Sequence, residues 1–473
     1  MRVFPSPRII GRALVALFVL VFVLAGQGCA APPETPSERA PKNIIILFGD
    51  GAAPMQWDFG RYTSAMLRGQ PFVTTDTVFR EGVLGLLATD ALGAYVADSA
   101  AAASAMSTGH KTVNGAISVT PEGKPQRTVM QAAKAAGKRI GLVTTAAVYD
   151  ATPAAFSINA RSRSDARVIV DAMFDLEPDV LMGGGARLFL PVGAPGGRRK
   201  DGKDLIAGFK AKGYAVARDT EELKSASGAR VLGLFADYFM SYELDRDPVK
   251  EPSTAEMADA ALKALSRDNE KGFVLLIENE NIDNAGHAND AASLMRALWA
   301  FDDAVRVALE FQRHHPDTLL IVTGDHETGG FSPTQSFADP LDWRRGAISP
   351  ATKELELLAG ITMSFGRAAE MLRANPGAGT LDALLAKHFP GFRLDPDLRE
   401  ALLERRPVGP AYTYLPQNAF GVMVARQTGF YWGTSAHTPQ PVAVGALGPG
   451  AHLFRGYQHN SDFGKHLQRL LAR

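Results

Sequence analysis

The stretch NIIILFGDG, residues 43–51, joins a continuous apolar run to an acidic residue, Asp50. A run of Ile, Leu and Phe without alternating polar residues is typical of a strand that is buried on both faces of a parallel sheet. Open sheets of this kind bind ligands beyond the carboxyl ends of their strands, which is where Asp50 would lie. The stretch therefore predicts a fold class and one edge of a candidate functional site.

Four further apolar runs have the same character: RIGLVTT (139–145), DVLMGG (179–184), FVLLIE (273–278) and TLLIVT (318–323). Helix-like segments lie between the runs, at residues 128–138, 253–268 and 289–311. The second of these has Ser253 at the N-cap and Glu256 at the capping-box position. This order predicts an α/β fold, a three-layer sandwich in which helices flank a mostly parallel central sheet.

The alternation of strands and helices stops between about residues 331 and 420. Loops that contain Pro and Asp separate short amphipathic helices there, such as ELELLAG and LREALLERR. We interpret this segment as an inserted cap region within one catalytic domain of residues 42–473, and not as a separate domain.

The charge balance limits the partners that the protein can have. The chain of 473 residues carries 50 Lys plus Arg and 50 Asp plus Glu, so its formal net charge is zero. A bulk charge that would attract nucleic acid is absent, and no nucleic acid partner is expected. Any site for phosphate or a metal ion must be built locally.

The N-terminus has the pattern of an export signal. Arginines precede the apolar run at residues 13–26, and Cys29, the only cysteine, follows it. We predict a signal peptide at residues 1–28, then a lipid-acceptor Cys29 and a Pro-rich tether at 29–41, which would anchor an exported protein in the periplasm or at the cell surface. Gly26 stands where lipoprotein signals usually have Leu, so an ordinary signal peptide or an uncleaved signal anchor is the alternative.

Acids or imidazoles follow four of the five predicted strands. They are Asp50 after the first, Asp150 with Thr152 after the second, Glu278 with Asp283 and His287 at the fourth, and Asp325 with His326 after the fifth. One Asp after a strand more often caps a helix or makes an Asx-turn. The combination predicts a shared site, because the carboxyl ends of parallel strands meet at one edge.

The residue types at this edge fit more than one metal ion. Asp283 and His287 would lie on one face of a helix, and His437 adds an imidazole from late in the chain. Mixed Asp/His ligands without a thiolate suit Zn²⁺ or a similar transition ion. An oxygen-only set suits Mg²⁺, and the chain offers Asp50, Thr152 and Glu278.

Ser99 allows two interpretations. It precedes an Ala-rich segment in DSAAAASAMSTGHKT (98–112), so it would begin a helix. A helix N-terminus favours an anion, and a nearby dication would lower the pKa of the hydroxyl enough to make it a nucleophile. The alternative is that Asp98 or Ser99 simply caps the helix, and the local sequence alone favours that alternative.

Several of these segments, with others between them, resemble the alkaline phosphatase family of the alkaline phosphatase superfamily, and they occur in its order. The matching segments include GDG, DSAAAASAMSTGHKT, VTTAAVYDATPAAF, IENENIDNAGHANDA, VTGDHETGG and GTSAHT, and they span the chain from about Lys42 onward. The resemblance implies hydrolysis of phosphate monoesters to an alcohol and inorganic phosphate through a phosphoserine at Ser99. It also implies two Zn²⁺ ions, one Mg²⁺ ion and, commonly in this family, a homodimer.

The resemblance assigns a role to each candidate residue. One zinc would be held by Asp283, His287 and His437, and the other by Asp50, Asp325 and His326. Magnesium would be held by Asp50, Thr152 and Glu278, with Asp150 beyond its direct ligands. The substrate phosphate would be clamped by Arg163, a role that fits a bidentate guanidinium.

Three other functions account for parts of the sequence. A related metallo-phosphodiesterase or sulfatase would use the same kinds of ligand. A serine hydrolase could combine Ser99, a later Asp and His437, but Ser99 lies in ADSAA and not in a G-x-S-x-G elbow. A non-catalytic surface lipoprotein would leave the nucleophile and the metal ligands without a purpose.

Asn284 is the clearest departure from the family pattern, which often has His or Lys after the metal-ligating Asp. A neutral amide holds phosphate less firmly than a cation, so we predict weaker product inhibition than in relatives with a basic residue at this position. The Asn284→His variant is expected to bind phosphate more tightly, which the inhibition constant for inorganic phosphate measures. An unchanged constant would rule the idea out.

Overall fold

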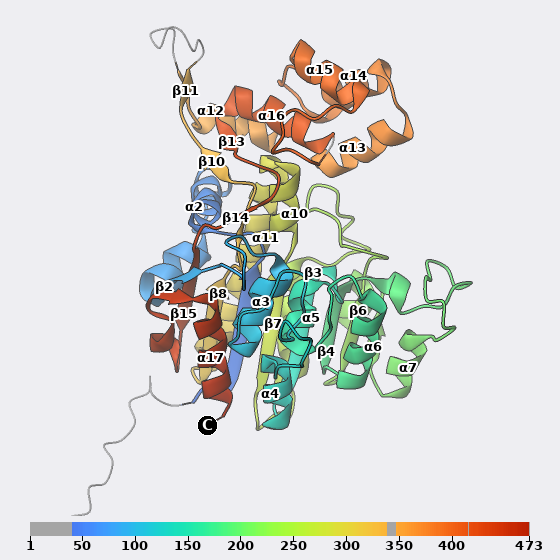
Figure 1. Cartoon of the computed structure of the whole chain (residues 1–473), viewed down its shortest axis with the longest axis vertical. Coiled ribbons are helices and arrows are strands. Elements are labelled where there is room, and N and C mark those ends of the chain that lie inside the picture. Colours follow the sequence, from blue (N-terminus) through green and yellow to red (C-terminus); the bar gives the residue numbers. More distant parts are fainter. Residues whose placement is uncertain (1–39, 338–346, 415, 473) are drawn as a thin grey trace, which may run out of the picture. The chain divides into compact units, whose positions relative to one another are not determined.

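Figure 1 shows the computed structural model, which describes residues 40–337, 347–414 and 416–472. The predicted signal peptide, Cys29 and nearly all of the tether lie outside these residues, so export and lipid attachment stay predictions. Within the described residues, no helix is both long enough and apolar enough to cross a membrane.

A ten-stranded sheet forms the centre of the structure, in the order β16-β2-β15-β8-β1-β7-β3-β4-β6-β5. All its neighbouring strands are parallel except at β15, which runs antiparallel to β2 and to β8. The bounds of the strands are β1 (Asn43–Gly49), β2 (Val83–Ala88), β3 (Arg139–Ala147), β4 (Val180–Gly184), β5 (Ala215–Ala217), β6 (Val231–Leu234), β7 (Phe273–Asn279), β8 (Thr318–Thr323), β15 (Val442–Leu447) and β16 (Gly456–His459).

The continuous apolar run of β1 serves two cores, because successive side chains of a strand point to opposite faces. Ile44, Ile46 and Phe48 pack into the core on one face of the sheet. Ile45 and Leu47 pack into the core on the other face. Helices cover both faces, which confirms the predicted three-layer α/β fold with a mostly parallel sheet (Figure 1).

The helices divide between the two cores. Those of the first core are α3 (Ser99–Thr108), α4 (Val129–Ala135), α5 (Ala151–Ser157), α6 (Ala166–Leu176), α7 (Leu205–Ala211) and α17 (Asn460–Leu471). Those of the second core include α2 (Pro54–Thr63), α8 (Thr220–Ser225), α9 (Thr254–Ser266), α10 (Asn281–Ala288) and α11 (Ala291–His314). The capping box predicted for Ser253 and Glu256 is present at the start of α9.

The segment that the sequence analysis interprets as an inserted cap contributes short strands and helices. Its strands are β10 (Phe331–Pro333), β11 (Ser336–Phe337) and β12 (Ala347–Ile348). Its helices are α12 (Thr352–Ala359), α13 (Phe365–Ala374), α14 (Ala378–His388), α15 (Pro396–Glu404) and the start of α16 (Gln417–Thr428). These helices, orange in Figure 1, share the second core, and α16 packs against α10. The chain then continues through β13 (Phe430–Trp432) and β14 (His437–Thr438), which pairs with β9 (Glu327–Thr328).

Small residues bring α3 and α17 close together. Every residue of α3 is buried. A Cβ atom on Gly464 of α17 would lie 2.5 Å from the backbone nitrogen of Gly109 and 2.6 Å from the carbonyl oxygen of Ala105. The backbone of α17 therefore approaches the C-terminal end of α3 directly.

We predict that Gly464→Ala destabilises the protein by about 1–3 kcal/mol, because the added methyl group forces the two helices apart. Thermal unfolding measures the effect. Gly379→Ala is the matched control, since Gly379 also lies in a helix but has no atom within 4 Å of its Cβ position. Alanine is the better helix former there by about 1 kcal/mol. Equal stability of the two variants would contradict the packing argument.

Candidate active site

The strand order brings the predicted acids together. β8, β1, β7 and β3 are consecutive parallel neighbours in the sheet. Asp325, Asp50 and Asp150 follow three of these strands, and Glu278 lies near the end of the fourth. Their carboxyl ends share one edge of the sheet, so the side chains converge from segments that are far apart in the chain.

The first cluster at this edge contains Asp283, His287 and His437. Helix α10 places Asp283 and His287 one turn apart, with 3.2 Å between His287 Nε2 and Asp283 Oδ2. His437 Nε2 lies 3.1 Å from His287 Nε2 and 3.6 Å from Asp283 Oδ1. Two imidazole nitrogens and a carboxylate thus face a common point.

Backbone carbonyls orient both imidazoles of this cluster. His287 Nδ1 lies 2.7 Å from the carbonyl oxygen of Ser435, and His437 Nδ1 lies 2.9 Å from that of Ala97. A nitrogen that faces a carbonyl oxygen must donate its proton there, so Nε2 is the atom turned toward the cluster. This is the usual way in which proteins prepare a histidine for a metal ion.

The second cluster contains Asp50, Asp325 and His326, which are all fully buried. His326 Nε2 lies 3.1 Å from Asp325 Oδ2 and 3.6 Å from Asp50 Oδ1. Asp50 Oδ1 and Asp325 Oδ2 have no hydrogen-bond donor within the described residues. The ring of His326 stacks on that of His437 with 3.6 Å between centroids, so the first two clusters are adjacent.

The third cluster contains only oxygen ligands, from Asp50, Glu278 and Glu280. The hydroxyl of Thr152 donates to Asp50 Oδ2 at 3.3 Å, as expected if it belongs to the same site. Glu278 Oε1 is buried without a donor in the described part of the chain. Glu280 was missed by the sequence analysis, although a residue two positions beyond a strand-end acid could have been included.

Burial and mutual repulsion make these carboxylates hard to ionise together. Burial raises the pKa of Asp325 to about 7 and that of Glu278 to about 8, and it raises the pKa of Asp50 well above its usual value. Burial opposes a charge on His287, but attraction to Asp283 raises the pKa of His287 to about 9. Divalent ions would compensate this negative charge, so the donor sets fit such ions.

Ser99 lies beside the second cluster, with 3.1 Å between Ser99 Oγ and His326 Nε2. Asp98, and not Ser99, is the N-cap of α3, because Asp98 Oδ1 accepts from the backbone nitrogen of Ala101 at 2.9 Å. The hydroxyl of Ser99 is therefore not used for capping. The cap interpretation is confirmed for Asp98, and the interpretation of Ser99 as a nucleophile stays a prediction.

Arg163 is held by two carboxylates at the same edge. Its Nη1 lies 3.3 Å from Asp98 Oδ2, and its Nη2 lies 3.5 Å from Asp150 Oδ2. Burial opposes the charge of the guanidinium, but Asp150 and Asp98 raise the pKa of Arg163 further above its usual value. Asp150 thus contacts Arg163. This contact agrees with the expectation that Asp150 does not bind the magnesium ion directly.

A pocket opens over these groups, and it is lined by Arg163, Glu280, Asp283, Asn284 and His287 among others. The inserted segment contributes Tyr414, whose ring stacks on that of His287 with 5.0 Å between centroids. Tyr414 was not predicted from the sequence, because no pattern in its loop points to it. The other seven histidines belong to none of the metal-ligand clusters found among the described residues.

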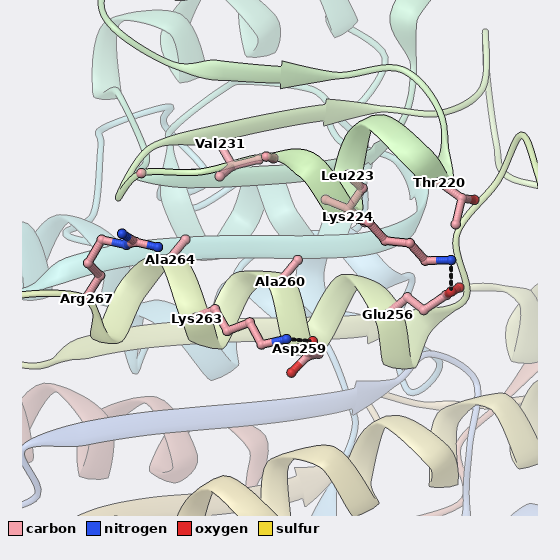
Figure 2. Close-up of a pocket in the computed structure, with 12 residues that line it drawn as sticks. Thr220, Leu223, Lys224, Val231, Glu256, Asp259, Ala260, Lys263, Ala264 and Arg267 are labelled. Atoms are coloured by element: carbon pink, nitrogen blue, oxygen red, sulfur yellow. Dashed lines mark hydrogen bonds and ion pairs between the residues drawn. The ribbon is translucent and has the colours of Figure 1, made fainter.

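A separate pocket lies away from these residues, between α8, β6 and α9 (Figure 2). Its acids are paired with lysines: Lys224 Nζ lies 3.6 Å from Glu256 Oε1, and Lys263 Nζ lies 2.5 Å from Asp259 Oδ2. No histidine lines it. Its carboxylates are paired and it contains none of the metal-ligand clusters found among the described residues, so it is not the candidate active site.

Comparison with known proteins agrees with this geometry. A family model described as alkaline phosphatase matches residues 41–472. The chain is 32% identical over 440 residues to alkaline phosphatase 3 of Bacillus subtilis, covering 91% of this chain and 89% of that protein. It is also similar to crystal structures of a cold-active alkaline phosphatase from Shewanella (34% identity, TM-score 0.75, 91% and 100% coverage) and of the Thermus thermophilus alkaline phosphatase (30%, 0.83, 95% and 94%).

The pKa shifts predict how metal ions and pH act on stability. In the metal-free protein, the folded state holds a proton on Glu278 up to about pH 8 and on His287 up to about pH 9, whereas the unfolded chain has lost both by pH 7. Their contribution to stability is therefore lost progressively as the pH rises, and the loss is complete only above about pH 8 for Glu278 and about pH 9 for His287, so stability still falls between pH 7 and pH 9. Bound ions replace these protons.

We expect the stabilisation by added Zn²⁺ and Mg²⁺ to grow between pH 7 and pH 9. The measurement is the difference in Tm between chelator-treated and metal-loaded protein at each pH. A difference that stays constant over this interval would contradict the assignment of these residues to the ion sites.

Proposed function

The chain belongs to the alkaline phosphatase family and is a phosphomonoesterase, and we propose that it acts through a phosphoserine formed on Ser99. The observation that carries the proposal is the position of Ser99 Oγ, 3.1 Å from His326 Nε2 and at the start of α3. The hydroxyl of Thr152 also lies at the start of a helix, α5, but it donates to Asp50 Oδ2, whereas Ser99 Oγ faces His326.

The three clusters support a site for two Zn²⁺ ions and one Mg²⁺ ion. Asp283, His287 and His437 would hold one zinc, and Asp50, Asp325 and His326 the other, because Asp/His sets suit zinc. The oxygen set of Asp50, Glu278 and Thr152, with Glu280 beside it, suits magnesium. Bound ions supply activation of the serine hydroxyl and of water, and they stabilise the charge on the leaving oxygen.

The residues of the chain position the phosphoryl group. Ser99 Oγ loses its proton and forms a bond to phosphorus, while the bond from phosphorus to the alcohol oxygen breaks and that oxygen takes up a proton. The N-terminus of α3 favours the negative charge of the phosphoryl oxygens. Arg163 can bind two of these oxygens, and its contacts with Asp98 and Asp150 fix the direction in which the guanidinium points.

Water completes the reaction by cleaving the phosphoserine. The water loses a proton and its oxygen forms a bond to phosphorus, while the bond from phosphorus to Ser99 Oγ breaks and Ser99 Oγ takes up a proton, which regenerates the serine. The net change is one ester and one water converted into one alcohol and one inorganic phosphate. No side chain is changed at the end, so the enzyme is ready for another substrate.

The geometry gives less support to a serine hydrolase. That alternative combines Ser99 with His437, whereas the imidazole beside Ser99 Oγ is that of His326. His326 Nε2 also faces the carboxylates of Asp325 and Asp50, in an arrangement suited to a cation.

We further propose that the protein is exported, that Cys29 attaches it to a membrane by a lipid, and that it forms a homodimer.

The test compares Ser99→Ala with the wild type on an aryl phosphate at alkaline pH, with metal content measured on the same samples. We expect Ser99→Ala to keep its metal ions and to lose activity by about a thousandfold or more, as for removal of a nucleophile. After an acid quench with substrate present, mass spectrometry should find phosphate on the wild-type peptide that contains Ser99.

Ser104→Ala is the matched control, since Ser104 lies in the same helix and its hydroxyl bonds to backbone atoms of Ala116 and Ser118, away from the clusters. The Ser104→Ala variant should retain the activity of the wild type. A wild-type protein with full metal occupancy and no activity would refute the proposal, and so would an active Ser99→Ala variant.

A further inference from the structure

The active-site pocket contains a second arginine, Arg187, whose role the proposed mechanism leaves open. Arg187 belongs to a short 3-10 helix, Ala186–Leu188, which follows β4. β4 is the neighbour of β3, so Arg187 lies at the sheet edge that also carries Asp150. One continuous pocket is lined by Arg187, Arg163 and the metal-ligand candidates Asp283 and His287.

Aromatic residues hold the guanidinium of Arg187 in place. Arg187 Nε donates a hydrogen bond to Tyr149 Oη at 3.2 Å. The guanidinium carbon lies 3.8 Å from the centre of the Tyr238 ring, which is a cation–π contact. The ring of Tyr238 in turn stacks on that of Phe239 with 4.3 Å between centroids. The arginine head is thus fixed before any ligand binds, which lowers the entropic cost of binding one.

Arg187 differs from Arg163 and Arg199 in its partners. Arg163 contacts Asp98 and Asp150, and Arg199 contacts Asp171 and Asp201. Within the described residues, Arg187 makes no ion pair, and its bond to Tyr149 is the one side-chain hydrogen bond that it donates. Its two terminal nitrogens remain available to an acceptor that enters the pocket.

We propose that Arg187, supported by Tyr149 and Tyr238, binds a second anionic group on the leaving alcohol of the substrate. The favoured substrates are phosphate monoesters whose alcohol part carries another phosphate or a carboxylate, because a guanidinium fork matches either group. Arg163 would receive the phosphoryl group that is transferred and Arg187 the distal anion. This inference rests on the proposed phosphomonoesterase activity and adds its substrate class.

The experiment uses n-butyl phosphate and 1,4-butanediol bisphosphate, which differ only in the second phosphate. For the wild type, kcat/KM should be higher for the bisphosphate after correction for its two equivalent phosphates. Arg187→Gln should reduce kcat/KM for the bisphosphate by about tenfold, chiefly through KM, and change that for butyl phosphate less than twofold. Arg187→Lys should recover part of the loss, because it keeps the charge.

Arg267→Gln is the control for net charge, since Arg267 lines the separate pocket in Figure 2. It should leave the ratio of the two kcat/KM values unchanged. Equal losses on both substrates in Arg187→Gln would show that Arg187 only supports the fold, and no loss on either would show that it does not contact the substrate. Each of these results overturns the inference. A wild type that hydrolyses neither ester would instead contradict the proposed function.

Discussion

Repulsion among carboxylates that are buried at one edge of the sheet is the constraint on which the rest of the structure depends. Asp50, Glu278, Asp283 and Asp325 come from three separate segments of the chain and are all buried. Removing charged groups from water is costly unless opposite charge accompanies them. Because of this cost, burial raises the pKa values of Asp325 and Glu278, so that both carboxyls tend to keep a proton in the absence of ions. Divalent ions compensate it, and the same ions then serve the chemistry.

Other features of the site follow from that requirement. The parallel strand order delivers the acids, and the carbonyls of Ser435 and Ala97 turn two imidazoles toward them. Capping by Asp98 leaves the hydroxyl of Ser99 free beside the clusters. The alanines of α3 are all buried, which allows the helix to approach its neighbours closely. The strand order, the orientation of the imidazoles, the capping by Asp98 and the packing of α3 all contribute to the same site.

The sequence was sufficient to predict the features that depend on local pattern. The apolar runs became β1, β3, β4, β7 and β8, and the capping box at Ser253 formed as expected. The acids at the strand ends gathered because parallel strands share an edge. Glu280 was overlooked since the predicted strand ended at Glu278, although both glutamates reach the same oxygen-rich cluster. Tyr414 and Arg187 could not have been found, because they reach the pocket through loop and turn geometry that leaves no periodic signal.

The most direct test of this account is anomalous diffraction at the zinc absorption edge from crystals of the wild type grown with Zn²⁺ and Mg²⁺. The account predicts two strong anomalous peaks, one among Asp283, His287 and His437 and one among Asp50, Asp325 and His326. It also predicts a third ion without a strong zinc signal among Asp50, Glu278 and Glu280. Anomalous peaks elsewhere, or none in these two clusters, would contradict the claim that buried carboxylates are assembled here to hold metal ions.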